Sequence, residues 1–238
     1  MKKIIIVCFL LFCSLTSLFS GDSATFVNLG FSSDCRYFMF AQHGYIPATG
    51  TAYSEMFIVD VQNNNFAQGG VVKGEYSAGM EPGQSSQGAL FSLLEKNFSL
   101  KNKFGIDHLK NGRLLYIQVT GTPGEKEEVD GSDTLPEGVL EFRDFVTGNV
   151  LRMELVQSVQ GSGDAVKSSF YINLDITSYN GLKQTYTIGH PNFMRDKITE
   201  YQINRVLIGP DNKSLIIIIA KKDTASNIRY MVETVRLK

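Results

Sequence analysis

The sequence has no tryptophan, and only three histidines and three cysteines among its 238 residues. Cys8 and Cys13 lie in an apolar N-terminal segment, so Cys35 alone remains if that segment is removed. A lone cysteine excludes an internal disulfide, although a thiol in an exported protein can pair between chains or bind a ligand. We interpret Cys35 as a small buried apolar residue at a turn.

The motifs of several enzyme classes are also absent. None of His43, His108 and His190 has a second His, Cys or carboxylate at zinc-ligand spacing. The sequence contains no P-loop, no dinucleotide fingerprint and no G-x-S-x-G nucleophile elbow. It therefore predicts no catalytic residue, no cofactor and no metal site.

An excess of charge of one sign is lacking as well. The chain has 23 basic and 24 acidic residues, and without Lys2 and Lys3 the net charge becomes −3. This balance does not direct the protein toward nucleic acid or an anionic membrane. After the N-terminal segment no apolar run approaches the ~20 residues of a spanning helix, and residues 216–220 suit a buried strand.

The first 20 residues have the layout of a secretory signal peptide. Lys2 and Lys3 precede a continuous apolar run over 4–11, and Ser20 and Gly21 are small residues at a cleavage point. We therefore predict a signal peptide over 1–20, a single β-rich domain over 21–238, and a periplasmic or secreted location. The alternatives are an uncleaved anchor or a lipoprotein; the large residues before Cys8 and Cys13 fit lipidation poorly.

Strand signals dominate the rest of the chain, which favours an all-β, mainly antiparallel fold. Residues 55–61 alternate, with Met56, Ile58 and Asp60 on one face. Turn pairs such as Asn180-Gly181 separate the apolar segments. We predict strands over 24–29, 37–42, 55–61, from 66, 113–120, 138–145, 150–159, 168–176, 184–188, 198–208, 214–221 and 227–237.

One segment, residues 85–97, has helical rather than strand periodicity. Ser85 or Ser86 can cap it, and its apolar positions share one face. We expect this amphipathic helix to pack on the sheet, with a partner-binding groove helix as the alternative. The residues of the apolar face are Leu90, Leu93, Leu94 and Phe98.

Two other segments have the composition of exposed loops. Residues 79–88 are rich in Gly, Ser and Gln, and residues 121–138 are acidic between Glu125 and Asp133. Clustered carboxylates can hold calcium. The spacing here matches no calcium loop, so we interpret the acidic residues as a solvated hairpin tip.

The two ends of the mature chain share a pattern of strand, tight turn and strand. Asp34 and Asp211 each lie in the turn, a basic residue follows two positions later, and an apolar strand comes next. This resembles the turn of propeller blades of the TolB and WD40-like kind, in which the Asp caps the turn. The residue after the Asp tolerates positive φ well at Asn212 and poorly at Cys35. The architecture is left open between a propeller-like fold, a barrel and a sandwich meander, and the similar ends suggest that both hairpins lie in one sheet.

Several stretches together carry a family resemblance. They are Phe26-Val-Asn-Leu-Gly-Phe-Ser, Arg36-Tyr-Phe, Glu55-Met-Phe-Ile-Val-Asp-Val, Gly189-His-Pro, Tyr201-Gln-Ile and Pro210-Asp. The chain resembles a family of bacterial predicted secreted proteins known as domain of unknown function 2259. The resemblance implies export and a β-rich fold, and it brings no catalytic residues with it.

The best local candidate for a binding site is the segment 189–196. It places His190, Arg195 and Asp196 in a loop between strands, where functional residues concentrate, and His43 lies in another loop. The alternative to a binding site is a turn with a purely structural role, in which Arg195 is paired with a carboxylate.

We therefore expect a non-catalytic exported protein that binds a protein or envelope component. One alternative is a periplasmic hydrolase that uses a carboxylate with His43 or His190; another is a small-molecule or metal-binding module. A cleft shared by the two histidines would favour the hydrolase, and their separation would weaken it. The candidate carboxylates are Glu55, Asp60 and Asp196.

Overall fold

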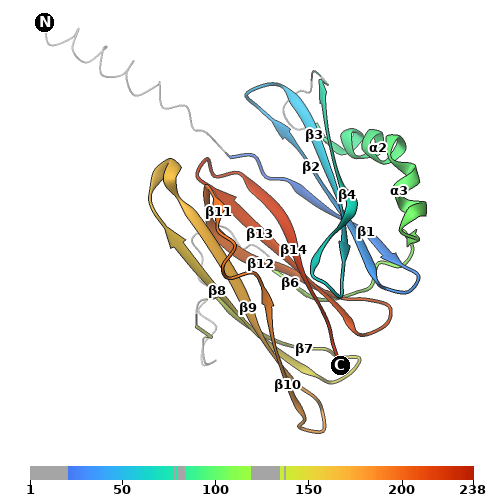
Figure 1. The fold of residues 1–238 in the computed structure, drawn as a ribbon, viewed down its shortest axis with the longest axis vertical. Coiled ribbons are helices and arrows are strands. Elements are labelled where there is room, and N and C mark those ends of the chain that lie inside the picture. Colours follow the sequence, from blue (N-terminus) through green and yellow to red (C-terminus); the bar gives the residue numbers. More distant parts are fainter. Residues whose placement is uncertain (1–20, 78, 80–83, 119–134, 137) are drawn as a thin grey trace, which may run out of the picture.

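Three antiparallel β-sheets lie one behind another in the computed structural model, and two helices cover one outer face (Figure 1). The structure describes residues 21–77, 79, 84–118, 135–136 and 138–238. The first sheet has the strand order β4-β3-β2-β1-β5, the second β10-β9-β8-β7 with β11 beside β9, and the third β14-β13-β12-β6. The predicted all-β, mainly antiparallel class is confirmed. Among the described residues no sheet closes into a barrel, so the fold is a stack of sheets.

The elements follow one another closely in sequence. The strands are β1 Thr25–Ser32, β2 Tyr37–Ile46, β3 Thr51–Asp60, β4 Asn65–Ser77, β5 Ile106–Asp107, β6 Arg113–Ile117, β7 Val139–Arg143, β8 Val150–Gln160, β9 Lys167–Thr177, β10 Lys183–Gly189, β11 Arg195–Asp196, β12 Ile198–Ile208, β13 Ser214–Asp223 and β14 Ile228–Arg236. The helices are α2 Gln87–Lys96, α3 Phe98–Lys103 and the 3-10 turn η1 Gly163–Ala165.

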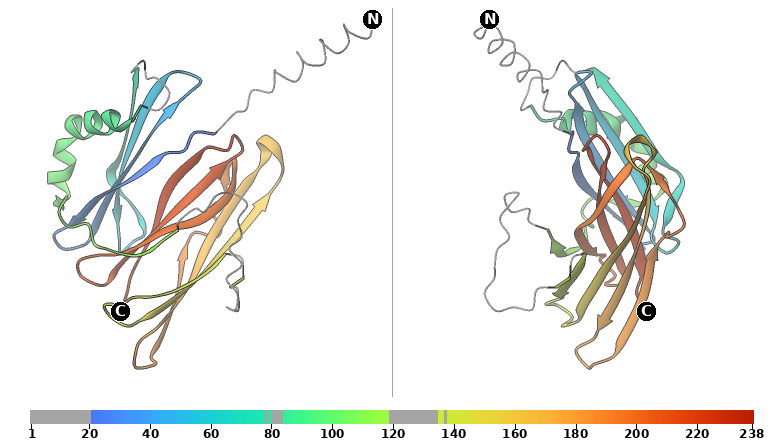
Figure 2. Two further views of the ribbon diagram at one scale, coloured as in Figure 1. Left: turned by 180° about the vertical axis from the view of Figure 1, so that it is seen from behind. Right: turned by 90° about the vertical axis from the view of Figure 1, so that its left-hand side faces the viewer.

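The third sheet is the middle layer, and both of its faces are buried (Figures 1 and 2). On β13, Ile217 and Ile219 pack against the second sheet, while Ile216 and Ile218 pack against the first. A strand that is covered on both faces needs apolar side chains at every position rather than at alternate ones. This accounts for the unbroken isoleucine run in the sequence.

The two similar hairpins at the chain ends lie in different sheets, so the prediction of one shared sheet is wrong. The β1–β2 hairpin belongs to the first sheet and β12–β13 to the third. Their turns touch instead, because Ser214 Oγ donates a hydrogen bond to the carbonyl of Cys35 over 3.2 Å. Cys35 (φ 56°) and Asn212 (φ 53°) both have positive φ, as expected for matching turns. Since β13 is apolar on both faces, its hairpin needs covering layers, and the N-terminal hairpin supplies one.

The edge of the third sheet is tied to the first sheet through side chains. Gln42 Oε1 accepts a hydrogen bond from the backbone N–H of Tyr230 over 2.7 Å, and Asn64 Oδ1 accepts one from Thr234 over 2.7 Å. An unpaired edge strand exposes such groups to other chains. These two bonds satisfy part of the β14 edge and fix the first sheet against it.

Helix α2 covers the outer face of the first sheet with Leu90 and Leu93, each 2% exposed. Phe98 was expected on the same face, but it is 62% exposed. The reason is that α2 ends at Lys96, and the chain changes direction at Asn97 before α3 begins. Among the described residues no helix is both long and apolar enough to cross a membrane. The predicted signal peptide, the acidic residues 125–133 and residues 80–83 lie outside the described part of the chain.

Candidate functional site

A cavity of about 400 Å³ lies where the turn between β3 and β4 meets the β13–β14 hairpin and the segment after β10. This junction cavity has a largely apolar wall and a group of polar and charged side chains. The apolar residues are Val59, Phe66, Phe193, Met231 and Val232. The polar and charged residues include Asn64, His190, Arg195, Lys221 and Glu233.

Glu233, on β14, is the one carboxylate of the junction cavity and is only 2% exposed. Asn64 Nδ2 donates a hydrogen bond to its Oε2 over 2.5 Å, and Arg195 Nη2 lies 3.8 Å from its Oε1. Burial raises the pKa of Glu233, although Asn64, His190 and Arg195 act in the opposite direction. The carboxylate is therefore already committed to groups of the protein.

Gly189, at the end of β10, allows the backbone to pass close to Glu233. Its φ is +105°, which favours glycine, and a Cβ there would lie 3.7 Å from Glu233 Cδ and 3.3 Å from Tyr171 Cα. A side chain at this position would therefore be strained and would press on the backbone of Tyr171, with Glu233 in ordinary contact. The glycine sets the path of the segment that carries His190 into the cavity wall.

Arg195 is held by aromatic rings as well as by Glu233. Its guanidinium lies 5.0 Å from the ring centroids of Phe170 and Phe193 and 5.8 Å from that of Tyr201. Such stacking over ring faces is favourable and fixes the plane of the guanidinium. The side chain is only 13% exposed, so the cavity contains a cation that is positioned in advance.

Lys221, on β13, is a second cation at the same cavity. Burial lowers the pKa of Lys221, the cations Arg195, Lys73 and Arg229 lower it further, and Glu55 opposes these effects. Glu55 is itself in an ion pair with Lys73 at 2.5 Å. Within the described part of the chain, no carboxylate forms an ion pair with Lys221. The cavity therefore has more positive than negative charge.

Asn64, in the turn between β3 and β4, connects the parts of this site, and it was not singled out from the sequence. Besides its bonds to Glu233 and Thr234, its carbonyl lies 3.5 Å from His190 Nε2. Its φ of 49° is one that Asn tolerates. The sequence did contain a signal for Glu233 and Lys221, since Lys221 directly follows the apolar run 215–220 and Glu233 follows Met231 and Val232.

The structure brings two of the four sequence-predicted residues together. His190 and Arg195 both line the junction cavity. Asp196 does not, because neighbouring residues of a strand point to opposite faces. Its side chain is 77% exposed and lies 3.4 Å from Lys167 Nζ.

His43 lies in strand β2 and not in a loop, so that prediction is wrong, and it is on the other face of the first sheet from the junction cavity. Its neighbour Gln42 faces β14, whereas His43 faces α2, where its Nδ1 lies 2.8 Å from Ser86 Oγ. The residue is 5% exposed, and burial lowers its pKa, which favours the neutral imidazole. The first sheet therefore separates His43 from His190, and this separation weakens the hydrolase hypothesis.

The two other candidate carboxylates also lie on opposite faces of the first sheet. Glu55 faces the third sheet and accepts a hydrogen bond from Gln42 Nε2 over 2.6 Å. Asp60 faces the other way and pairs with Arg36 at 3.4 Å. No grouping of three or more His, Cys, Asp or Glu residues suited to a metal occurs within the described ranges.

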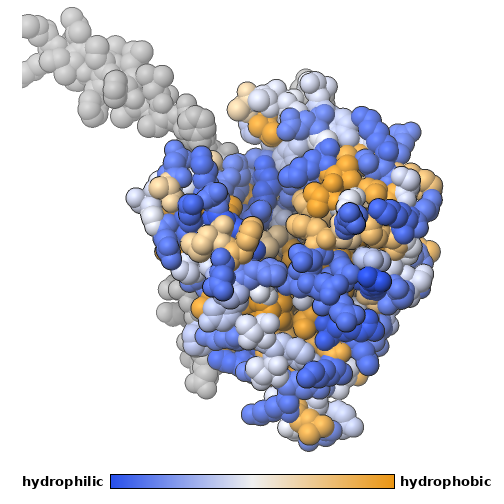
Figure 3. Space-filling view, viewed as in Figure 1, coloured by the Kyte–Doolittle hydropathy of each residue, from blue (hydrophilic) through white to orange (hydrophobic). Residues whose placement is uncertain are grey.

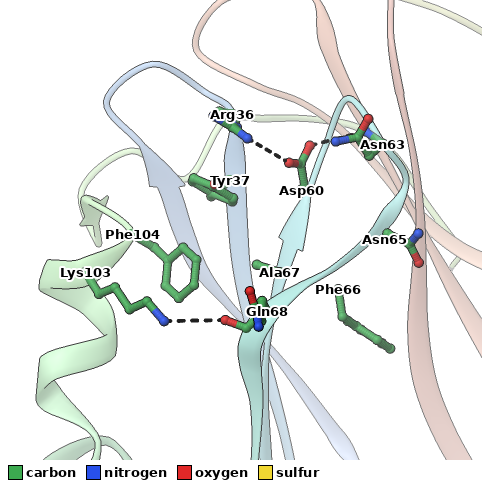
Figure 4. Close-up of a pocket in the computed structure, with 10 residues that line it drawn as sticks. All are labelled: Arg36, Tyr37, Asp60, Asn63, Asn65, Phe66, Ala67, Gln68, Lys103 and Phe104. Carbon is green, nitrogen blue, oxygen red and sulfur yellow. Dashed lines mark hydrogen bonds and ion pairs between the residues drawn. The ribbon is translucent and has the colours of Figure 1, made fainter.

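A second, larger cavity of about 680 Å³ lies on the helix side of the same turn (Figure 4). There Arg36 is paired with Asp60, and Lys103 Nζ lies 3.5 Å from the carbonyl of Gln68. Figure 4 shows Phe66 projecting away from Phe104. Each charged group of this open groove already has a partner in the protein, since Arg36 and Asp60 pair with each other and Lys103 bonds a backbone carbonyl.

Comparison with known proteins finds one family. The family model described as "Predicted secreted protein (DUF2259)" matches residues 39–236. No curated protein and no solved structure matches the chain. The match confirms the resemblance seen in the sequence and the predicted export, and the family description states no activity and no partner.

Proposed function

The chain belongs to the DUF2259 family of predicted secreted proteins, and on that premise we propose that it binds a small amphipathic anion in the junction cavity. The anion would be a carboxylate or phosphate that carries an aliphatic or aromatic group. The observation that carries this proposal is an excess of positive charge in a largely apolar cavity, where Arg195 and Lys221 accompany a single carboxylate, Glu233.

The charge balance of the cavity favours an anion over a cation or a neutral ligand. Glu233 is already bonded to Asn64 and Arg195, so it does not need a cationic ligand. Lys221 has a lowered pKa and no ion-pair partner within the described ranges. A bound anion would give Lys221 a counterion and would form charge-assisted hydrogen bonds, which are stronger than neutral ones.

The size and wall of the cavity favour a ligand that has an apolar part. A volume of about 400 Å³ lies within the range of small-molecule pockets, which are usually lined by apolar side chains. Phe66 and Phe193 stand at the surface with 53% and 61% exposure. An apolar group that lay between these rings would remove both from water, which is favourable by about 25 cal/mol per Å².

Binding is a better interpretation than catalysis at this cavity. Nucleophilic catalysis by serine, threonine or cysteine needs that hydroxyl or thiol next to a base. The described contacts of His190 and Glu233 are to Asn64 and Arg195, and none is to a serine, threonine or cysteine. For this cavity we therefore favour the binding of a small molecule over the binding of a protein partner.

Lys221→Met tests this function directly. The probe is anilinonaphthalene sulfonate, an amphipathic anion, and decanoate is the competing ligand. The fluorescence of the probe measures both its own binding and its displacement by decanoate. Wild-type protein should bind the probe and release it to decanoate. Because the variant loses one charge-assisted contact, its affinity for both anions should fall about tenfold. Lys222→Met makes the same change at the next, exposed position of β13 and should bind like wild type.

The stability of Lys221→Met separates a binding effect from misfolding. The pKa of Lys221 is lower in the folded protein, so its charge opposes folding at neutral pH, and stability rises as the pH rises toward 10.5. The variant should therefore unfold at the same urea concentration as wild type or a higher one. Wild-type protein that binds neither anion, or a variant that binds both as tightly as wild type, would contradict the proposal.

A further inference from the structure

We propose that the adjacent turns β7–β8 and β9–β10 form a membrane-docking tip that inserts shallowly into a lipid bilayer surface. The tip consists of Phe145 and Val146 on the first turn and Tyr179 and Leu182 on the second. Their exposed fractions are 93%, 70%, 84% and 64%. This surface is separate from the junction cavity and does not depend on the ligand proposed for it.

The two turns lie side by side at one end of the second sheet. A Cβ built on Gly148 would lie 3.4 Å from Tyr179 Cβ, so the turns are in contact. The strands that lead into them are also paired, with Val150 opposite Thr177. Figure 1 shows the β9–β10 hairpin projecting at the end of the molecule, and Figure 3 shows apolar surface at this projection.

The turn that carries Phe145 and Val146 is held rigidly by a buried carboxylate. Asp144 is 5% exposed and forms a two-pronged ion pair with Arg113. It also accepts hydrogen bonds from the backbone N–H of Val146 (3.0 Å) and from Thr147 Oγ1 (2.7 Å). The fold therefore keeps these two apolar side chains pointing outward, although they contribute nothing to a core.

The second turn is equally well defined. The backbone N–H of Ser178 donates to the carbonyl of Leu182 over 2.8 Å, and that of Leu182 lies 3.3 Å from Asn180 Oδ1. Asn180-Gly181 supplies the turn conformation. Tyr179 and Leu182 are therefore not needed to form the turn. A tyrosine and a leucine at a projecting tip suit the boundary between head groups and acyl chains.

The charges around the tip favour a lipid surface. Arg143 and Lys183 flank the two turns, both are exposed, and neither forms an ion pair with a described residue. The single acid within the turns, Asp144, is buried and neutralised by Arg113. Although the chain as a whole has a small negative net charge, Arg143 and Lys183 are two exposed basic residues beside the tip that would meet anionic lipid there. Export of the protein makes a membrane surface available to it.

Vesicle flotation with the full exported protein tests the docking tip. The vesicles are phosphatidylcholine alone and phosphatidylcholine mixed with phosphatidylglycerol. Wild-type protein should float with both and more strongly with the anionic mixture. Phe145→Ser, Tyr179→Ser and Leu182→Ser combined should lower the partition coefficient more than about tenfold, because three apolar anchors are lost.

Two controls make the result specific. Phe91→Ser with Phe98→Ser removes rings that are 58% and 62% exposed on the helices, and this variant should float like wild type. Lys183→Gln should lower binding roughly fivefold on anionic vesicles only, because one basic residue near the surface is lost. Circular dichroism checks that each variant is folded.

Failure of the wild type to float with either vesicle would overturn the proposal. So would equal losses in the tip variant and in the Phe91 and Phe98 control, because the binding would then be unspecific. Lys221→Met should float like wild type. Failure of the membrane-docking proposal can therefore be told apart from failure of the proposed anion binding in the junction cavity.

Discussion

At the scale of single residues, buried polar side chains hold particular turns and strands in place through hydrogen bonds and ion pairs. Cys35 is 3% exposed and unpaired, and burial raises the pKa of its thiol, so its interpretation as a small buried residue is confirmed. Asn64 holds two strands and a carboxylate together. Asp144 combines one ion pair with two further hydrogen bonds in a single tight turn.

Asp144→Asn should destabilise the protein in a way that depends on pH. Burial raises the pKa of Asp144, but the ion pair and hydrogen bonds outweigh it and lower the pKa to about 2, from 3.8 in the unfolded chain. A carboxylate whose pKa is lowered by folding stabilises the folded state at pH values above its pKa in the unfolded chain. This stabilisation is lost as the pH falls from about 4 to about 2. The difference corresponds to about 2 kcal/mol near neutral pH.

Urea unfolding at a series of pH values measures this effect. The variant should lose about 2 kcal/mol near pH 7 and should approach wild-type stability at the acid end. Asp164→Asn is the matched control, because Asp164 pairs with Lys197 at 3.3 Å but is 91% exposed. Surface pairs of this kind contribute little, so the control should match wild type. A loss that is equal at both ends of the pH range would contradict the role given to the carboxylate charge.

At the scale of elements, β13 organises the fold because it belongs to two cores at once. Ile217 lies in the core shared with the second sheet, and Ile218 lies in the core shared with the first. Both are 0% exposed. An outer strand has one buried face, so substitutions at adjacent positions should differ strongly in how much they lower the free energy of unfolding. On β13, adjacent substitutions should have similar effects.

Ile217→Ala and Ile218→Ala should therefore have similar effects. Each leaves a cavity in a packed core, which typically lowers the free energy of unfolding by about 2–5 kcal/mol. Val159→Ala on β8 is a control at a 47% exposed position and should cost less than about 1 kcal/mol. Chemical denaturation of the three variants gives the comparison. If either isoleucine variant lost as little free energy of unfolding as Val159→Ala, β13 would not be covered on both faces.

The sequence predicts the strands well because their signals are local. Alternation over 55–61 gives the two faces of β3 correctly, with Met56 and Ile58 toward the helices and Phe57 and Val59 toward the third sheet. The stacking of the sheets depends on contacts between distant segments, and so the hairpins at the two ends were placed in one sheet. The shortest elements, α3, β5 and β11, have too few residues to show a period.

The junction cavity was predictable only in part for the same reason. His190 and Arg195 are close in sequence, and a loop brings them together. Glu233 and Lys221 reach the cavity from β14 and β13, and Asn64 reaches it from the first sheet. Their proximity follows from how the sheets stack, which no local pattern in the sequence specifies.

At the scale of the whole molecule, the three layers depend on one another. The third sheet contributes residues to the cores on both of its faces, and the first sheet also shares a core with α2. Removing any layer would expose a buried apolar face. We therefore propose that residues 21–238 form one cooperative domain, as the sequence predicted.

Variants in the two outermost layers test this cooperativity. Leu90→Ala lies in α2 and Met153→Ala in the second sheet, and both side chains are at most 2% exposed. Each should lower the free energy of unfolding by about 2–4 kcal/mol. In a domain of this size that corresponds to a fall in Tm of roughly 5–15 °C. Because the middle sheet connects the layers, scanning calorimetry should show one transition in each variant, with equal calorimetric and van't Hoff enthalpies. Two transitions, one lowered by Leu90→Ala and the other by Met153→Ala, would mean that the layers fold separately and that the chain has more than one domain.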